Sequence, residues 1–318
     1  MSTMVDDTAI DDQTQTPAER LRDGFTACRL RLKKFGEWKA ASESENLTAA
    51  EALGADDKRF RGRKKLLESD AGLKKVKNRL KAASDYWKAM SLASSEPGFR
   101  YIRREDLAEI DARLDQFKGE IAVASEEYND CYYQDAVEKA RREMGDLFDR
   151  SQFPADVSDA FDADWEFVDI NPPDYLKVLK PEVYQREVAR VQQRLAMVAD
   201  RAEQEFVEKF SDLLETLTDR LRSGKWFGEG RFSDLQEFFD RFRRLNVTGN
   251  EDLERLVDEA KNRLAGVNSS TMQGTKEVNQ ALRGALATNL GEIQEGLLTM
   301  LRDRPRRVVT RKKQEDDD

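Results

Sequence analysis

The sequence contains no histidine, and this absence removes much of the chemistry that enzymes commonly use. Without imidazole there is no Ser–His or Cys–His nucleophile and no histidine-bearing zinc or di-iron site. The phosphate-binding pattern G-x-x-x-x-G-K-[ST] is also missing, which excludes the P-loop enzymes. We therefore predict a protein without enzymatic activity, cofactor or bound metal. One alternative stays open, a metal-dependent enzyme that uses carboxylates alone, because acidic residues are abundant and no spacing singles out a set of ligands.

Cysteine and long apolar segments are scarce as well. The two cysteines, Cys28 and Cys131, lie far apart in the sequence and each falls on an apolar face. We expect free, buried thiols in a reducing compartment rather than a disulfide. No apolar run approaches the roughly 20 residues that span a bilayer, and the first residues lack the apolar segment of a secretory signal. The sequence therefore predicts a cytoplasmic protein.

Proline and glycine are infrequent, with 7 and 17 residues in a chain of 318, whereas charged residues make up 37%. This composition favours long solvated helices over a compact sheet. Only residues 165–170 and 307–310 have the composition of strands. We therefore predict an all-α protein.

The most regular apolar pattern lies within residues 104–148. Its apolar positions alternate in steps of three and four: Leu107, Ile110, Leu114, Phe117, Ile121, Ala124, Tyr128 and Cys131. This is a heptad pattern, which indicates a long helix with one apolar stripe. A second long helix is predicted over residues 181–222, where the mean step is about 3.7. We expect the two helices to pack antiparallel, with coiled-coil-like packing, at the centre of an elongated helical bundle.

Changes in composition divide the chain into five regions. Within the second of these regions, a helix is predicted from Pro17 to near Ser42. A capping box at Thr48 and Glu51 predicts the start of a second helix there. The regions are a disordered acidic tail (1–15), an N-terminal helical region with a basic run (16–95), a long helical hairpin with an acidic crossover loop (96–222), a C-terminal helical region (223–303) and a charged tail (304–318).

Basic residues crowd residues 58–81, and a second basic cluster lies in the charged tail. Together with Phe60, Tyr86 and Trp87, the first cluster has the composition of a surface that follows phosphates and stacks on bases. The net charge of −9 argues against a nucleic-acid-binding surface over the whole protein, and a solvated helix with core aromatics explains the same pattern. The candidate contacts are Arg59, Arg61, Arg63, Lys64, Lys65, Lys74, Lys75, Arg306 and Arg307.

Two groups of aromatic residues are candidates for a protein interface. A strict heptad drifts away from a partner with a longer period, so the end of the stripe is predicted to face another chain. Tyrosines suit such a place because the ring is buried while the hydroxyl stays in water. The candidates are Tyr128, Tyr132, Tyr133, Trp226 and Phe227. The alternatives are that the N-terminal helix covers the tyrosines and that Trp226 and Phe227 fold their loop back onto the bundle.

Several blocks of the sequence resemble a family of uncharacterised helical accessory proteins of phages and bacterial mobile elements. The blocks are Phe35-Gly36-Glu37-Trp38, residues 53–56 with 64–67, and residues 225–247. The resemblance spans most of residues 20–307 and identifies no catalytic residue. It implies a bacterial or phage-infected cell as the setting and an AAA-type ATPase among the partners.

These observations predict a non-enzymatic helical scaffold or adaptor that acts through protein–protein interaction, with a second copy of itself among its partners. The alternative is a nucleic-acid-associated accessory factor that uses residues 58–81 and 304–313.

Overall fold

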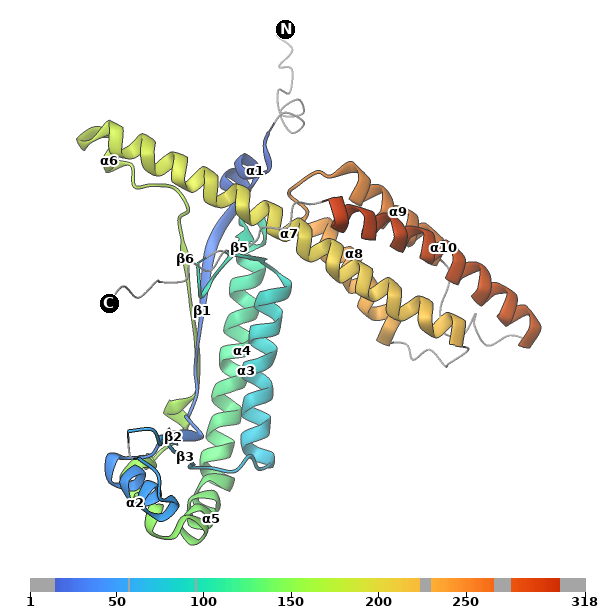
Figure 1. Ribbon diagram of the computed structural model, residues 1–318. Coiled ribbons are helices and arrows are strands. Elements are labelled where there is room, and N and C mark those ends of the chain that lie inside the picture. The colour runs from blue at the N-terminus through green and yellow to red at the C-terminus, as the bar shows by residue number, and fades with distance from the viewer. Residues whose placement is uncertain (1–14, 57, 95, 224–229, 266–275, 304–318) are drawn as a thin grey trace, which may run out of the picture. The chain divides into compact units, whose positions relative to one another are not determined.

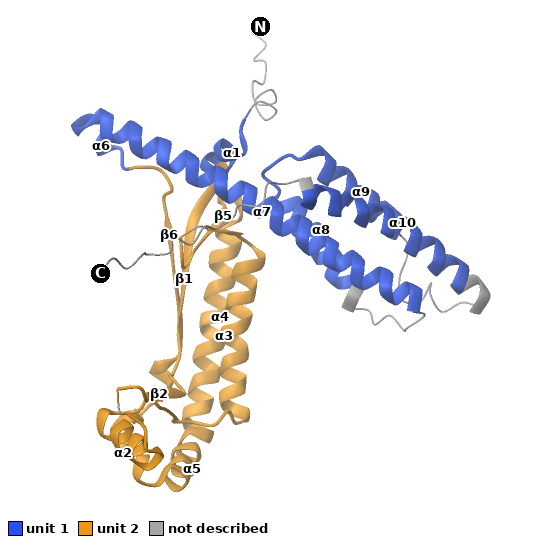
Figure 2. Ribbon diagram, viewed as in Figure 1, with its two compact units in different colours: residues 1–23, 173–318 blue, residues 24–172 orange. Residues whose placement is uncertain are grey.

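The computed structural model describes residues 15–56, 58–94, 96–223, 230–265 and 276–303 (Figure 1). The chain forms two compact units (Figure 2). Unit 1 comprises residues 1–23 and 173–318, and unit 2 comprises residues 24–172. The strand considered at residues 307–310, the charged tail and all but the last residue of the acidic tail lie outside the described residues.

The prediction of an all-α fold is wrong, because unit 2 contains two antiparallel sheets beside its helices. The larger sheet has the order β4-β5-β1-β6 and the smaller one pairs β2 with β3, so the protein is α+β. The strands are β1 (Phe25–Lys33), β2 (Trp38–Ala40), β3 (Arg63–Lys65), β4 (Leu92–Ala93), β5 (Phe99–Arg103) and β6 (Asp162–Val168).

The long N-terminal helix is replaced by a short helix and a strand. Helix α1 (Pro17–Gly24) ends at Gly24, and β1 follows between β5 and β6. Along β1 the apolar residues alternate with Arg29, Arg31 and Lys33, as a strand with two different faces requires. The next helix, α2 (Glu43–Leu53), starts at a capping box formed by Ser42 and Glu45 rather than at Thr48.

The outer strand β6 pairs with β1 through opposite charges. Arg31 lies 2.5 Å from Glu166 and 3.4 Å from Asp164, and Arg29 lies 3.3 Å from Glu166. The segment predicted as an irregular acidic crossover, residues 154–180, therefore contains a strand whose acidic residues face the basic face of its neighbour.

Helices α3 (Ala71–Ala89) and α4 (Leu107–Tyr128) pack side by side along the sheet of unit 2 (Figure 1). The ion pair between Arg79 and Glu120, at 3.1 Å, and the pair between Lys75 and Glu127 show that the helices run antiparallel. The heptad residues of α4 are at most 5% exposed from Ile110 to Tyr128, so the stripe does form a core. Its partner is α3, however, and the predicted hairpin with residues 181–222 is wrong.

A π-helical turn, Asn129–Tyr133, joins α4 to α5 (Gln134–Met144). The turn places the rings of Tyr128 and Tyr132 against Gly72 at the start of α3. A Cβ atom at Gly72 would lie 2.6 Å from the Tyr132 ring and 2.9 Å from the Tyr128 ring. A residue without a side chain is therefore required where α3 meets the end of α4.

The described part of unit 1 is helical, with α1, α6 (Tyr175–Leu179), α7 (Pro181–Ser223), α8 (Gly230–Leu245), α9 (Glu251–Leu264) and α10 (Lys276–Asp303). The long helix α7 packs mainly along α10. It meets α8 through phenylalanines, since the rings of Phe210 and Phe238 stack at 4.9 Å and those of Phe206 and Phe242 meet edge-on at 5.2 Å. The second predicted long helix thus exists, with α8 and α10 as its partners.

We expect Gly72→Ala to lower the free energy of unfolding of unit 2 by roughly 1–3 kcal/mol, because the added methyl group overlaps two rings. The matched control is Gly119→Ala in α4, where the new Cβ meets nothing within 4 Å. The control should raise stability by about 0.5–1 kcal/mol, the usual gain for glycine to alanine inside a helix. Hydrogen exchange of the β1 and β5 amides measures both changes in unit 2 alone. Effects of the same sign for the two variants would contradict the close packing at Gly72.

Candidate functional site

The basic residues of α3 face acidic residues of the same unit. Besides the pairs of Arg79 and Lys75 with α4, Lys77 lies 2.5 Å from Glu37 and Lys81 lies 2.9 Å from Asp85. These pairs are partly exposed, and each contributes at most about 1 kcal/mol to stability. These pairs neutralise part of the charge that the basic run would present to a polyanion.

Lys64, a predicted nucleic-acid contact, is 8% exposed and lies inside unit 2. Its ammonium group donates to a carboxylate oxygen of Glu45 at 2.6 Å and to the backbone oxygen of Leu147 at 3.0 Å. These two bonds join β3 to α2 and to the segment after α5. The hydrogen bond from Lys64, followed by that from the Ser42 backbone N–H, lowers the pKa of the Glu45 carboxyl. Lys64 is thus a structural residue, and its assignment to a nucleic-acid surface is wrong.

The aromatic residues expected beside the basic run belong to the core. Trp87 is 8% exposed, and Tyr86 packs on Phe117 with ring centroids 5.8 Å apart. Phe60 is half-buried. None of these three rings offers an open face for stacking comparable to that of Trp38, which is 53% exposed.

Trp38 comes close to the basic run through the pairing of β2 with β3. In this ladder Trp38 lies opposite Lys65, Lys39 opposite Lys64, and Ala40 opposite Arg63. The two strands are separated by α2 in the sequence, so their pairing could not be read from the local pattern. Of the predicted contacts, Arg59, Arg61, Arg63 and Lys65 are exposed on or beside this ladder, while Lys74 and Lys75 are exposed on α3.

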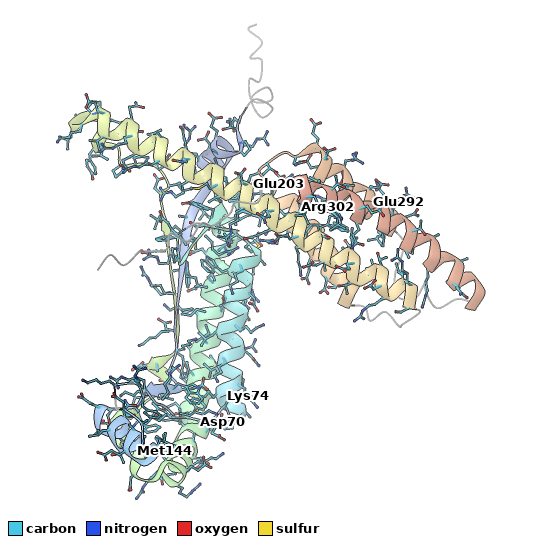
Figure 3. All side chains as sticks on the ribbon, viewed as in Figure 1. Asp70, Lys74, Met144, Glu203, Glu292 and Arg302 are labelled. Carbon is cyan, nitrogen blue, oxygen red and sulfur yellow. The ribbon has the colours of Figure 1, made fainter. Side chains whose placement is uncertain are left out.

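A recess of about 360 Å³ lies between the segment after β3 and helix α5 (Figure 3, where Asp70 and Met144 are labelled). Its wall contains Lys139, which donates to Glu68 at 3.0 Å and lies 3.8 Å from Glu143. The bond from Lys139 lowers the pKa of Glu68, and the bond to Glu68 raises the pKa of Lys139. Both shifts stabilise the charged forms, so these groups are paired ions rather than a proton donor and acceptor poised near neutral pH. Among the described residues, no group of three or more cysteine and carboxylate side chains is placed to hold a metal ion.

Two of the three tyrosines predicted at a protein interface are core residues. Tyr128 and Tyr133 are both 0% exposed, and their ring centroids lie 6.0 Å apart. The Tyr133 hydroxyl donates to the Pro154 backbone oxygen at 2.9 Å, and burial raises its pKa to about 12. Burial, followed by the nearby Asp70 carboxylate, also raises the pKa of Tyr128. Tyr132 is 37% exposed and stays at the surface, as does the free thiol of Cys131.

The other cysteine behaves as expected. Cys28 is a free, buried thiol in β1, and burial raises its pKa to about 11, so it stays protonated at neutral pH. Trp226, Phe227, Arg306 and Arg307 lie outside the described residues.

The most exposed apolar group of the described chain that sequence analysis missed lies on α6 in unit 1. Tyr175, Val178 and Leu179 are 61%, 85% and 71% exposed. Their spacing of three and four residues places them on one face of the helix. The signal was present in the sequence as an apolar group, Tyr175 to Leu179, but the preceding prolines suggested an irregular loop.

Comparison with known proteins found no family model, no curated protein and no solved structure that matches the chain. Within the described residues, no helix combines the length and apolarity needed to cross a bilayer.

We expect Lys64→Met to lower the free energy of unfolding of unit 2 by roughly 2–3 kcal/mol, because it leaves the Glu45 carboxylate without its main partner. The matched control is Lys74→Met, which removes an exposed lysine and should change stability by less than about 0.5 kcal/mol. Amide hydrogen exchange in β3 and β5 measures the change in the free energy of unfolding for both variants. Equal stability of the two variants would show that Lys64 has no structural role.

The ion pair between Lys64 and Glu45 predicts how the stability of unit 2 depends on pH. Because folding lowers the pKa of Glu45 from its usual 4.5, its contribution is complete above pH 4.5 and disappears as the pH falls through the folded-state pKa. A Glu45→Gln variant should therefore be less stable than the parent at pH 7 and should lose less stability on acidification. Parallel urea-denaturation curves from pH 7 downward test this, and a constant difference between the two proteins would contradict it.

Proposed function

We propose that the protein is a non-enzymatic adaptor that acts by binding other proteins, and that α6 with the start of α7 forms its contact surface. The observation that supports this is the exposure of Tyr175, Val178 and Leu179 on one face of a single short helix. Soluble proteins rarely leave several large apolar side chains together in water unless a partner covers them. Leu176 on the same helix, and Val183 and Tyr184 at the start of α7, are half-buried.

The first partner that we propose is a second copy of the chain. A two-fold interface must be complementary to itself, so charges of both signs should surround its apolar centre. The rim of α6 has this property, with Asp174 and Glu182 near Lys177 and Lys180. Lys177 already pairs with Asp174 at 2.7 Å, which leaves Lys180 and Glu182 to meet the partner. An AAA-type ATPase, which the sequence resemblance implies, is the proposed heterologous partner.

We propose that the adaptor works in the cytoplasm. The support comes from Cys131, whose free thiol is exposed. An exposed unpaired cysteine is compatible with a reducing compartment and is a liability in an oxidising one.

A photo-crosslinking amino acid at position 178 tests the contact surface in the native host. We expect a covalent adduct from position 178 and none from position 209, because Lys209 is also exposed but lies among charged residues on α7. An adduct of twice 36.5 kDa identifies a second copy, and any other mass identifies a different protein. The proposal fails if position 178 gives no adduct or the same adducts as position 209.

The double variant Val178→Glu and Leu179→Glu tests self-association in purified protein. Light scattering across a hundredfold dilution should show a parent mass that rises above 36.5 kDa with concentration, whereas the variant stays at 36.5 kDa. The expected loss of affinity is at least tenfold, because two charged groups would have to be desolvated in the interface. Identical masses for parent and variant would rule out α6 as the dimer contact.

A further inference from the structure

We propose that the face of the β2–β3 ladder formed by Trp38, Arg63 and Lys65 binds single-stranded nucleic acid. This surface belongs to unit 2 and shares no residue with α6 in unit 1, so either proposal can fail without the other. Three features support this proposal: the geometry of the ladder, the charge around it and the exposure of the indole ring.

The geometry follows from the register. Alternate residues of a strand share a face, so Trp38 and Ala40 lie on one face of β2 and Arg63 and Lys65 lie on the same face of β3. Trp38 is directly opposite Lys65, and Arg63 is its diagonal neighbour, roughly 7 Å away. The small side chain of Ala40 leaves the space between Trp38 and Arg63 uncovered. The result is a flat aromatic ring with a cation opposite it and a second cation one step along the ladder.

The charge around the ladder is predominantly positive. Exposed basic residues lead into β3: Lys58, Arg59 and Arg61. Lys39 is also exposed, but it lies opposite Lys64 on the other face of the ladder. Three of the acidic residues nearby are already engaged by other lysines, whereas the exposed Asp56 accepts from the Lys58 backbone N–H. Glu37 pairs with Lys77 at 2.5 Å, Glu45 pairs with Lys64 at 2.6 Å, and Glu68 pairs with Lys139 at 3.0 Å. Lys65 lies 3.7 Å from Glu68, a longer contact that leaves its ammonium able to reach a phosphate.

The exposed ring points to the ligand class. Tryptophan is highly buried on average, and an indole that is 53% exposed beside arginine and lysine has the features of a stacking platform. Bases in a single strand can leave their neighbours and stack on such a ring, while the phosphates on either side meet the cations. In a duplex the base faces are covered by neighbouring pairs, so the ring would add nothing. An acidic protein segment would use the cations and equally leave the ring without a role.

The test measures binding of a fluorescein-labelled oligothymidine of about 20 nucleotides by anisotropy, with the full chain at about 50 mM salt. Trp38→Ala should weaken binding roughly 5- to 150-fold, the range measured for removal of one stacking ring. Trp38→Phe should restore affinity to within several-fold of the parent, since a phenyl ring also stacks. That rescue separates a stacking role from a loss of folding.

Reversing the charge of a basic residue is the second part of the binding test. Arg63→Glu should weaken binding and reduce the salt slope by about 0.7 or more, the value for one lost phosphate contact on a single strand. The matched control is Lys209→Glu, an equal change of charge at an exposed position of α7, which should leave both affinity and slope unchanged.

Three results would overturn the proposal. The first is an absence of oligothymidine binding by the parent at low salt. The second is equal affinity of the parent and Trp38→Ala. The third is stronger binding of a duplex of the same length, or of polyglutamate, than of the single strand, because either would assign the basic surface to another class of partner.

Discussion

Unit 2 depends on the contact between the apolar stripe of α4 and helix α3. The stripe from Ile110 to Tyr128 is almost completely buried, and the ion pairs along the edge of the seam run from Lys75 to Arg79. Strands β4 and β5 form an antiparallel pair that connects α3 to α4, so the packing of the two helices also fixes the position of this pair. Strand β1 pairs with β5 and is positioned in turn. Gly72 sets the distance at the far end of the seam, where the tyrosine rings of the π-helical turn fill the space that a side chain would occupy. A π-helical turn moves the residues that follow it around the helix axis, so Tyr133 faces the core while Tyr132 stays at the surface.

Charged residues hold neighbouring elements of the fold together at several places. Charged residues make up 37% of the sequence, and many of them meet a partner of opposite sign on a neighbouring element. The pairs join α3 to α4 and β1 to β6, and Lys64 joins β3 to α2. Exposed pairs of this kind contribute little to stability one at a time, but they favour one strand register and one helix partner over others. The basic run is therefore a poor guide to a binding surface until its partners are known.

The sequence predicted the buried stripe of α4 correctly, because the period of apolar residues reports which face of a helix is covered. It did not predict the partner, since many amphipathic helices can cover such a stripe. The strand β1 was missed because Leu21, Phe25, Cys28 and Leu32 also fit a helical period, whereas the alternation of arginine and leucine within residues 29–33 was the correct signal. The candidate site shows the same limit. The burial of Lys64 and the position of Trp38 opposite Lys65 both depend on strands and helices that meet only in the folded chain. The apolar residues of α6 were visible in the sequence, but their exposure was not.

The division of the chain has a consequence for the order of folding. Unit 2 is inserted into unit 1, so α1 is separated by residues 24–172 from the helices with which it forms a unit. Domains generally fold as units during synthesis, and here all residues of the continuous unit 2 are made before those of α7 to α10. Arg20 in α1 can meet its neighbour Gly249 only after residue 249 has been made. Leu21 in the same helix is fully buried in the folded protein. Helix α1 is thus made before unit 2 but takes its place in unit 1 after it, and closing this long loop is expected to be a slow step in the assembly of unit 1.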